Sequence, residues 1–155
     1  MTPTERLADA GYPLLTAPRP IGLYVPATTS GTLIFTSGQI PIHEGSIDPS
    51  FIGTVGTTVS VEQAQQAAAH AVANAVHAIA ELVGDLECIE RIVKMTGFVA
   101  SSANFTDQSE VMNAASILLN HVFGDAGKHA RSAVGVASLP RGVCVEIELI
   151  VQIKA

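Results

Sequence analysis

Residues 129–150 read HARSAVGVASLPRGVCVEIELI, and this stretch contains two runs that are typical of β-strands. The runs cover residues 131–138 and 143–153, and β-branched or small residues alternate along both. Leu139-Pro140-Arg141-Gly142 separates them. Because Pro and Gly favour tight turns, we predict that the two strands form a β-hairpin.

The first of these strands has one unusual face. Alternation places Ser132, Val134, Val136 and Ser138 together, and we expect this face to belong to the core. The other face carries Arg131, Ala133, Gly135 and Ala137. Three tiny residues beside a guanidinium would leave room for a small acid, which arginine binds through paired N–H donors. In the alternative interpretation, Arg131 lies on the surface and the small residues admit a packed neighbour.

Glu146, in the second strand, is the acidic group that could join Arg131. If Leu139 opposes Gly142, Glu146 lies on the face of Arg131, two residue pairs away. A slip of one residue would move it to the opposite face, so counting leaves both arrangements open. A solvated carboxylate on an amphipathic strand is the simpler interpretation of Glu146.

Upstream of this stretch, the sequence predicts two helices and at least two more strands. Ser60 and Gln63 match a capping box, followed by apolar residues at helical spacing up to Gly84. A second helix is expected over residues 106–122. Strands are expected over 32–39 and 92–100, a further strand is open within the N-terminal segment, and 43–59 is expected to be a long loop.

The predicted order is strand, helix, strand, helix, hairpin, which favours an α+β fold with two helices on one face of a sheet. With 155 residues, we expect a single domain over residues 1–155. The net charge of −6 and the scattered basic residues argue against nucleic-acid binding. We expect no membrane contact and no signal peptide, and the two cysteines, which form no CxxC motif, favour a cytoplasmic setting.

The five histidines do not form a metal site in the sequence. His70 and His77 are seven residues apart, too far for the usual helical metal pair, so no metal is expected. His43 and His121 are expected to be solvated. His129 lies two residues before Arg131 and could move protons there, although we favour a non-catalytic role for it.

Four segments together resemble the reactive intermediate deaminase family, also called Rid or YjgF-like. They are IGLYV (21–25), IFTSGQIPI (34–42), IVKMTGFVAS with a following NF (92–105), and residues 129–150 quoted above. The resemblance covers almost the whole chain from residue 20. The combination of SGQIP with ARSxVxVxxLPxxVxVEIExI is highly specific.

The resemblance implies a chorismate-mutase-like α+β fold and a homotrimer whose ligand sites lie between subunits. It implies hydrolysis of reactive imines or enamines, such as 2-aminoacrylate, to a keto acid and ammonia without a cofactor. By position, Arg131 matches the arginine that binds the substrate carboxylate, and Glu146 matches the acidic residue that activates water. Tyr24 matches a tyrosine at the pocket. Ser37 and Asn113 match residues near the substrate, although Asn113 also fits a solvated helix stripe.

Three departures from the family pattern lie close to these residues. Ala133 stands where many members carry a thiol or hydroxyl, His129 where many carry proline, and Leu23 where IGPY has proline. They keep open a second function, a non-catalytic protein that binds or senses a small carboxylate metabolite. A third, the ribonuclease role of some members, is disfavoured by the negative charge.

Overall fold

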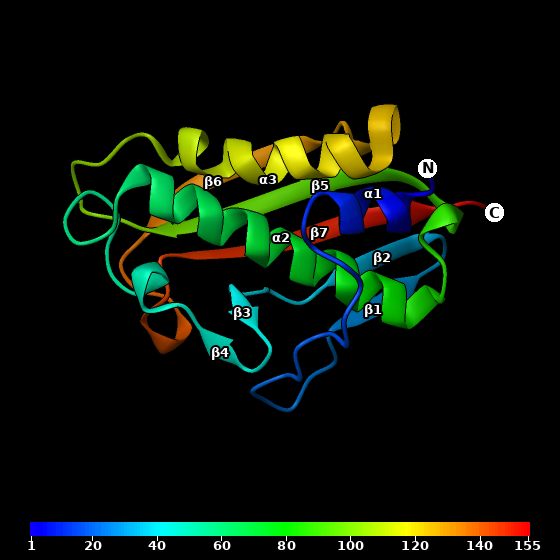
Figure 1. Ribbon diagram of the computed structural model, residues 1–155, viewed down its shortest axis with the longest axis horizontal. Coiled ribbons are helices and arrows are strands. Elements are labelled where there is room, and N and C mark those ends of the chain that lie inside the picture. Colours follow the sequence, from blue (N-terminus) through cyan, green and yellow to red (C-terminus); the bar gives the residue numbers. More distant parts are fainter.

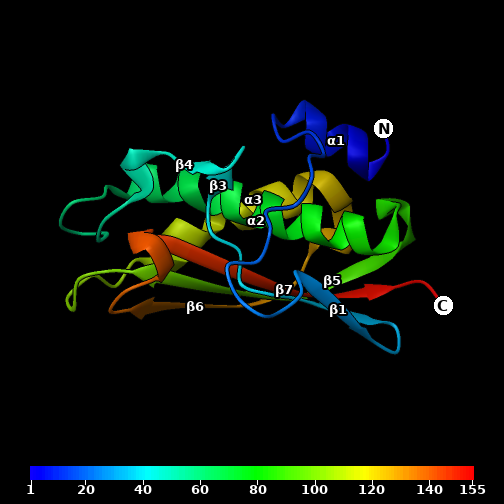
Figure 2. The same ribbon diagram turned by 90° about the horizontal axis from the view of Figure 1, so that it is seen from below.

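A computed structural model describes all residues, 1–155, as a mixed five-stranded sheet with its helices on one side (Figures 1 and 2). The elements are α1 (Pro3–Asp9), β1 (Ala27–Ser30), β2 (Leu33–Thr36), β3 (Ile42–His43), β4 (Ser46–Ile47), α2 (Val61–Val83), β5 (Ile89–Ala100), α3 (Gln108–Phe123), β6 (Ala130–Val136) and β7 (Val145–Ile153). The α+β class and the placement of helices on one face are therefore confirmed.

The strand order of the sheet is β1-β2-β7-β5-β6, and it contradicts the predicted hairpin. β6 pairs in parallel with β5, while β7 pairs antiparallel with the other side of β5. The 3₁₀ turn Pro140–Gly142 therefore begins a connection that crosses over β5 instead of closing a two-stranded turn. β6 becomes an edge strand of the sheet.

α2 begins as the sequence predicts and packs along the middle of the sheet. The Ser60 hydroxyl accepts a hydrogen bond from the backbone of Gln63, and the Gln63 side chain bonds the backbone of Ser60. This capping box satisfies two N–H groups that the first helical turn leaves free. Gly84 ends the helix with a φ of 82°, a left-handed conformation that favours glycine.

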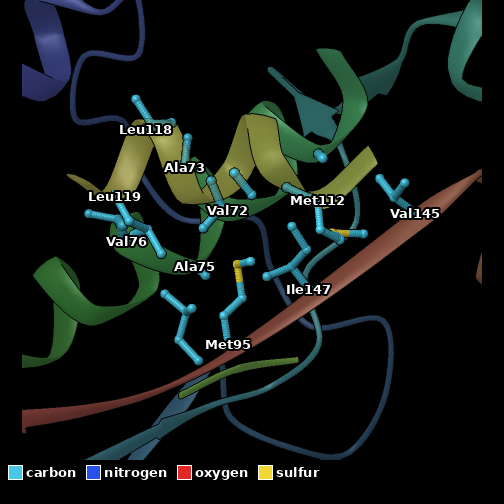
Figure 3. Packing of buried hydrophobic residues seen from close by; sticks show 14 of the residues in the cluster. Val72, Ala73, Ala75, Val76, Met95, Met112, Leu118, Leu119, Val145 and Ile147 are labelled. Atoms are coloured by element: carbon cyan, nitrogen blue, oxygen red, sulfur yellow. The ribbon is translucent and has the colours of Figure 1, made fainter. Parts of the chain in front are cut away.

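The core lies between the two long helices and the sheet (Figure 3). Met95 of β5 and Ile147 of β7 point toward Val72 of α2 and Met112 of α3, and all four are fully buried. Gly97 of β5 provides the space for Met112, because a Cβ at this position would collide with the Met112 thioether. This close packing fixes the distance between α3 and the strands beneath it.

Two parts of the chain were not predicted in detail. α1 is a third helix and lies on the outer side of α2 and α3, where its Leu7 is fully buried (Figure 2). Residues 43–59 are not a plain loop, because they contain β4 and a 3₁₀ turn at Pro49–Phe51 and take part in β3. None of the helices has both the length and the apolar character needed to cross a membrane.

Candidate active site

Arg131 lies on the helix side of the sheet and is held by α3. In β6 it pairs with Met95, whose side chain is in the core. Its Nη1 donates to Oδ1 of Asn113 and Oγ of Ser116, both at 3.0 Å. Its Nη2 donates to Oγ of Ser109 at 2.6 Å. Three polar side chains of α3 thus bind Arg131 and are not merely solvated.

No carboxylate neutralises Arg131. All of its bonds go to neutral oxygen atoms, and it makes no ion pair. The contacts of Nη1 are partly buried, whereas those of Nη2 are exposed. An anion approaching from solvent would therefore meet Nη2 first, with the guanidinium already oriented by Asn113 and Ser116.

His129 contacts Ser116, one of the residues that bind Arg131. Its Nδ1 lies 2.6 Å from the carbonyl oxygen of Gly127, and its Nε2 lies 3.1 Å from Oγ of Ser116. Because a carbonyl only accepts, the neutral ring carries its proton on Nδ1 and accepts from the Ser116 hydroxyl at Nε2. His129 thereby orients Ser116 toward Arg131.

The space expected beside Arg131 is partly filled by the chain itself, and the remaining cavity, of about 540 Å³, is lined by Gly135 and Ala137 but not by Arg131. A Cβ at Gly135 would come within 2.8 Å of the side chains of Gln108 and Ser101. Ala133 packs against the core, and it pairs with Gly97 beneath Met112. The small residues of β6 therefore admit the packed neighbour of the alternative interpretation. The opposite face, expected to be core, is open to solvent, and Val134 is 43% exposed.

Glu146 lies on the opposite face of the sheet from Arg131. It pairs with Phe98, which in turn pairs with Val134, whereas Arg131 belongs to the row of Met95 and Leu149. Paired residues point to the same side of a sheet. The register that would place Glu146 beside Arg131 is therefore wrong, because β5 separates their strands and the two rows point in opposite directions.

Glu146 instead shares a cleft with Tyr24. The cleft is lined by Pro18, Arg19, Pro20, Ile21, Tyr24, Pro26, Gly38, Gln39, Ile40, Ile42, Pro140 and Glu146. Gly38 leaves the room that the carboxyl group occupies, because a Cβ there would come within 2.8 Å of it. Burial raises the pKa of Glu146, and the nearby charge of Glu148 raises it further.

Ser37 lies next to this cleft but does not line it. Its hydroxyl donates to the carbonyl of Val25 at 2.6 Å, and its backbone N–H donates to Pro26 at 2.8 Å. Next to it, Gln39 exchanges two backbone bonds with Ile147, at 2.8 and 3.0 Å. The SGQ segment thus ties the Tyr24 loop to β7, beside Glu146.

The structure therefore divides the five predicted site residues into two groups. Arg131 and Asn113 lie together at the β6 edge, and Tyr24, Ser37 and Glu146 lie together around the cleft. Sequence reasoning did not assign Ser109 and Ser116 to Arg131, although their helical spacing with Asn113 was visible. It also missed Gly38, whose role depends on a contact between distant segments. No three His, Cys, Asp or Glu side chains lie close enough to hold a metal ion.

Comparison with known proteins identifies the family of the chain. The family model described as Endoribonuclease L-PSP, which covers the Rid and YjgF-like proteins, matches residues 14–153. The chain belongs to this family. As a Rid protein it is 39% identical to Protein TCP17 of Trypanosoma cruzi over 149 residues, covering 96% of this chain and 92% of that protein.

Two further Rid relatives are a named deaminase and a solved structure. The 2-iminobutanoate/2-iminopropanoate deaminase of Salmonella typhimurium is 38% identical over 134 residues, covering 86% of this chain and 90% of that protein. The crystal structure of Atu1372 from Agrobacterium tumefaciens, described as of unknown function, is 43% identical with a TM-score of 0.90. That match covers 98% of this chain and 92% of the other. The Rid family and fold are thus established for this chain.

Proposed function

We propose that this protein hydrolyses small 2-imino acids, and their enamine tautomers such as 2-aminoacrylate, to a 2-keto acid and ammonia. The observation that carries the proposal is the unpaired guanidinium of Arg131, oriented by Asn113 and Ser116 with its Nη2 facing solvent. A substrate carboxylate would replace the exposed contacts to Ser109 and gain a charge-assisted pair of bonds. The name of the Salmonella relative supports this substrate class.

The site would need two copies of the chain. Arg131 and Glu146 face opposite sides of the sheet, so one small molecule does not reach both within one subunit. The cleft at Glu146 also has a volume of only about 60 Å³, well below the several hundred expected of a ligand site. We infer a homotrimer in which the Arg131 edge of one subunit closes the Tyr24 and Glu146 cleft of the next.

In this arrangement, the residues would divide the chemistry between them. An enamine first takes a proton at its terminal carbon and becomes the iminium form of the 2-imino acid. Ionised Glu146 then removes a proton from water as the oxygen attacks the C=N carbon. Glu146 returns this proton to the amino nitrogen of the resulting carbinolamine, and the C–N bond breaks to release ammonia. The hydroxyl group loses its proton to Glu146 as the C=O bond of the keto acid forms, and Glu146 passes it to solvent, which balances the proton that the enamine took up. The raised pKa of Glu146 suits these proton transfers.

The direct test is release of keto acid from imines generated in situ by a pyridoxal-phosphate dehydratase acting on serine or threonine. We expect the wild-type protein to accelerate this release and Arg131→Ala to reduce kcat/KM at least about a hundredfold. Arg91→Ala, which removes an exposed arginine of β5, serves as the charge-matched control. Wild-type rates equal to those of buffer across the panel would refute the proposal.

The alternative of a non-catalytic carboxylate receptor rests on a specific observation, Ala133 beside Arg131. The wild-type and Arg131→Ala proteins also distinguish this receptor from an enzyme. Thermal stabilisation of wild type by 2-ketobutanoate, absent in Arg131→Ala and accompanied by no turnover, would favour a receptor. Turnover that depends on Arg131 favours the enzyme.

A further inference from the structure

A second and larger cavity lies on the outer side of α2, away from Arg131. Its volume is about 470 Å³, compared with about 60 Å³ for the cleft at Glu146. Two segments cover it, one formed by residues 15–21 and the other by residues 42–45. Asn74 and His77 form its α2 side. This volume falls in the range of sites for small molecules.

His77 is the unsatisfied group of this cavity. It is only 5% exposed, and its Nε2 is buried with no hydrogen-bond partner. The neighbours on the same helix face are satisfied. Asn74 donates to the carbonyls of Ile40 and Ile42 at 2.9 and 2.8 Å, and Glu81 accepts from the backbone of Ala17 at 2.7 Å. Buried polar groups are nearly always paired, so His77 points to a missing partner.

The chemistry of Nε2 defines what this partner must offer. Burial lowers the pKa of His77, with smaller opposing effects from the Tyr12 backbone and from Glu81, so the ring is neutral at pH 7. The Nε2 atom of a neutral ring carries either a proton or a lone pair, so its partner must accept or donate accordingly. A hydroxyl group can do both.

The charges around the cavity favour an anion. Arg19 and Arg141 both line it, and neither makes an ion pair or a side-chain hydrogen bond. Arg141 is placed by a left-handed turn with a φ of 58°. The one acidic group of the lining is Glu44, whose carboxylate lies 3.9 Å from the ring of His43. Two guanidinium groups without an ion pair thus line the cavity together with a single carboxylate.

We propose that this cavity binds a small hydroxy acid, whose hydroxyl group forms a hydrogen bond with Nε2 of His77 and whose carboxylate pairs with Arg19 and Arg141. This site is separate from Arg131 and does not depend on the deaminase proposal. Its wall is nevertheless shared, because Pro18, Arg19, Ile21 and Ile42 line both the cavity and the cleft of Tyr24. Arg141 and His77 line the cavity but not the cleft, so substitutions at these two residues test the cavity by itself.

The probe is L-malate, with succinate as a matched compound that lacks only the hydroxyl group. Both are titrated into full-length protein carrying ¹⁵N-labelled histidine, and the ring nitrogens of His77 are followed by NMR. We expect L-malate to shift the Nε2 signal in a saturable manner and succinate to bind at least about tenfold more weakly. The proposal would be overturned if L-malate does not shift the Nε2 signal, or if succinate shifts it equally at the same concentrations.

Variants locate the site independently of the deaminase centre. Arg141→Ala should weaken L-malate binding about tenfold, whereas Arg91→Ala and Arg131→Ala should leave it unchanged. His77→Phe should lose the preference for L-malate over succinate. If Arg131→Ala abolishes the response while Arg141→Ala has no effect, the ligand occupies the Arg131 site and the second site does not exist.

Discussion

At the scale of single residues, the structure makes Arg131 part of a polar network rather than a free side chain beside a hollow. Alternation along the strand correctly groups Arg131 with Ala133 and Gly135 on one face. It does not reveal what covers that face, since Gln108 and Met112 come from a helix about 20 residues away in sequence. Contacts between distant segments are the part of a site that a local pattern leaves undetermined.

Asn113 orients the guanidinium, and its removal tests that role. Asn113→Ala removes the acceptor of the 3.0 Å bond from Nη1, so Arg131 becomes mobile and the substrate carboxylate binds less well. We expect KM to rise about tenfold, with a smaller change in kcat. Ser109→Ala is the control, because it removes only a contact that the substrate would displace. Equal effects of the two variants on KM would contradict the orienting role.

Glu146 should reduce the stability of the subunit at neutral pH. Its pKa is raised above the ordinary 4.5 by burial and by Glu148, so the folded state holds this proton more tightly than the unfolded state. The contribution of Glu146 to stability is therefore fully present below the pKa of the unfolded state. It is lost as the pH rises from that value through the higher pKa of the folded state. Glu146→Gln should raise Tm by about 2 °C at pH 7.

The pH dependence of the change in Tm shows whether it comes from ionisation of Glu146 or from another effect of the substitution. The gain in Tm should shrink as the pH is lowered toward 4, below the ordinary pKa of 4.5, where Glu146 is mostly protonated in both the folded and the unfolded state. Glu90→Gln, at an exposed carboxylate of β5, is expected to leave Tm unchanged at both pH values. A Glu146→Gln protein that is less stable than wild type at pH 7 would show that the carboxylate is stabilising.

At the scale of elements, local signals predicted the helices well and the strand pairing poorly. The capping box at Ser60 and the glycine at 84 depend on neighbouring residues, and both lie where the sequence places them. The pairing of β6 depends on β5, whose paired residues lie 36 positions upstream, as Met95 does for Arg131. The Pro-Arg-Gly segment is compatible with a hairpin turn, and only the insertion of β5 between the strands excludes one.

The N-cap of α2 offers a test at this scale. Ser60→Ala removes the hydroxyl group that accepts from the Gln63 backbone, and we expect a loss of about 1 kcal/mol in the free energy of unfolding. Asp107→Ala is the matched control, because Asp107 occupies the N-cap of α3 without a side-chain bond. Urea unfolding should give a clear loss for the first variant and a smaller one for the second. The reverse order would contradict the assigned caps.

At the scale of the whole molecule, the sheet has one covered face and one that carries no helix (Figure 2). Phe35 and Val134 are 38% and 43% exposed, and Glu146 opens onto the same side. A second copy of the chain on this side would cover these apolar groups and bring an Arg131 edge toward the cleft. The resemblance noted in the sequence implies such a trimer, whereas a single sequence carries no pattern that specifies it.

Subunit mixing tests this shared site most directly. Arg131→Ala and Glu146→Gln are each expected to be inactive alone, but a mixed trimer contains one interface with an intact Arg131 facing an intact Glu146. Equal amounts of the two proteins, unfolded and refolded together, should therefore recover about a quarter of the wild-type deaminase activity. Activity no higher than that of either variant alone would contradict a site built from two subunits.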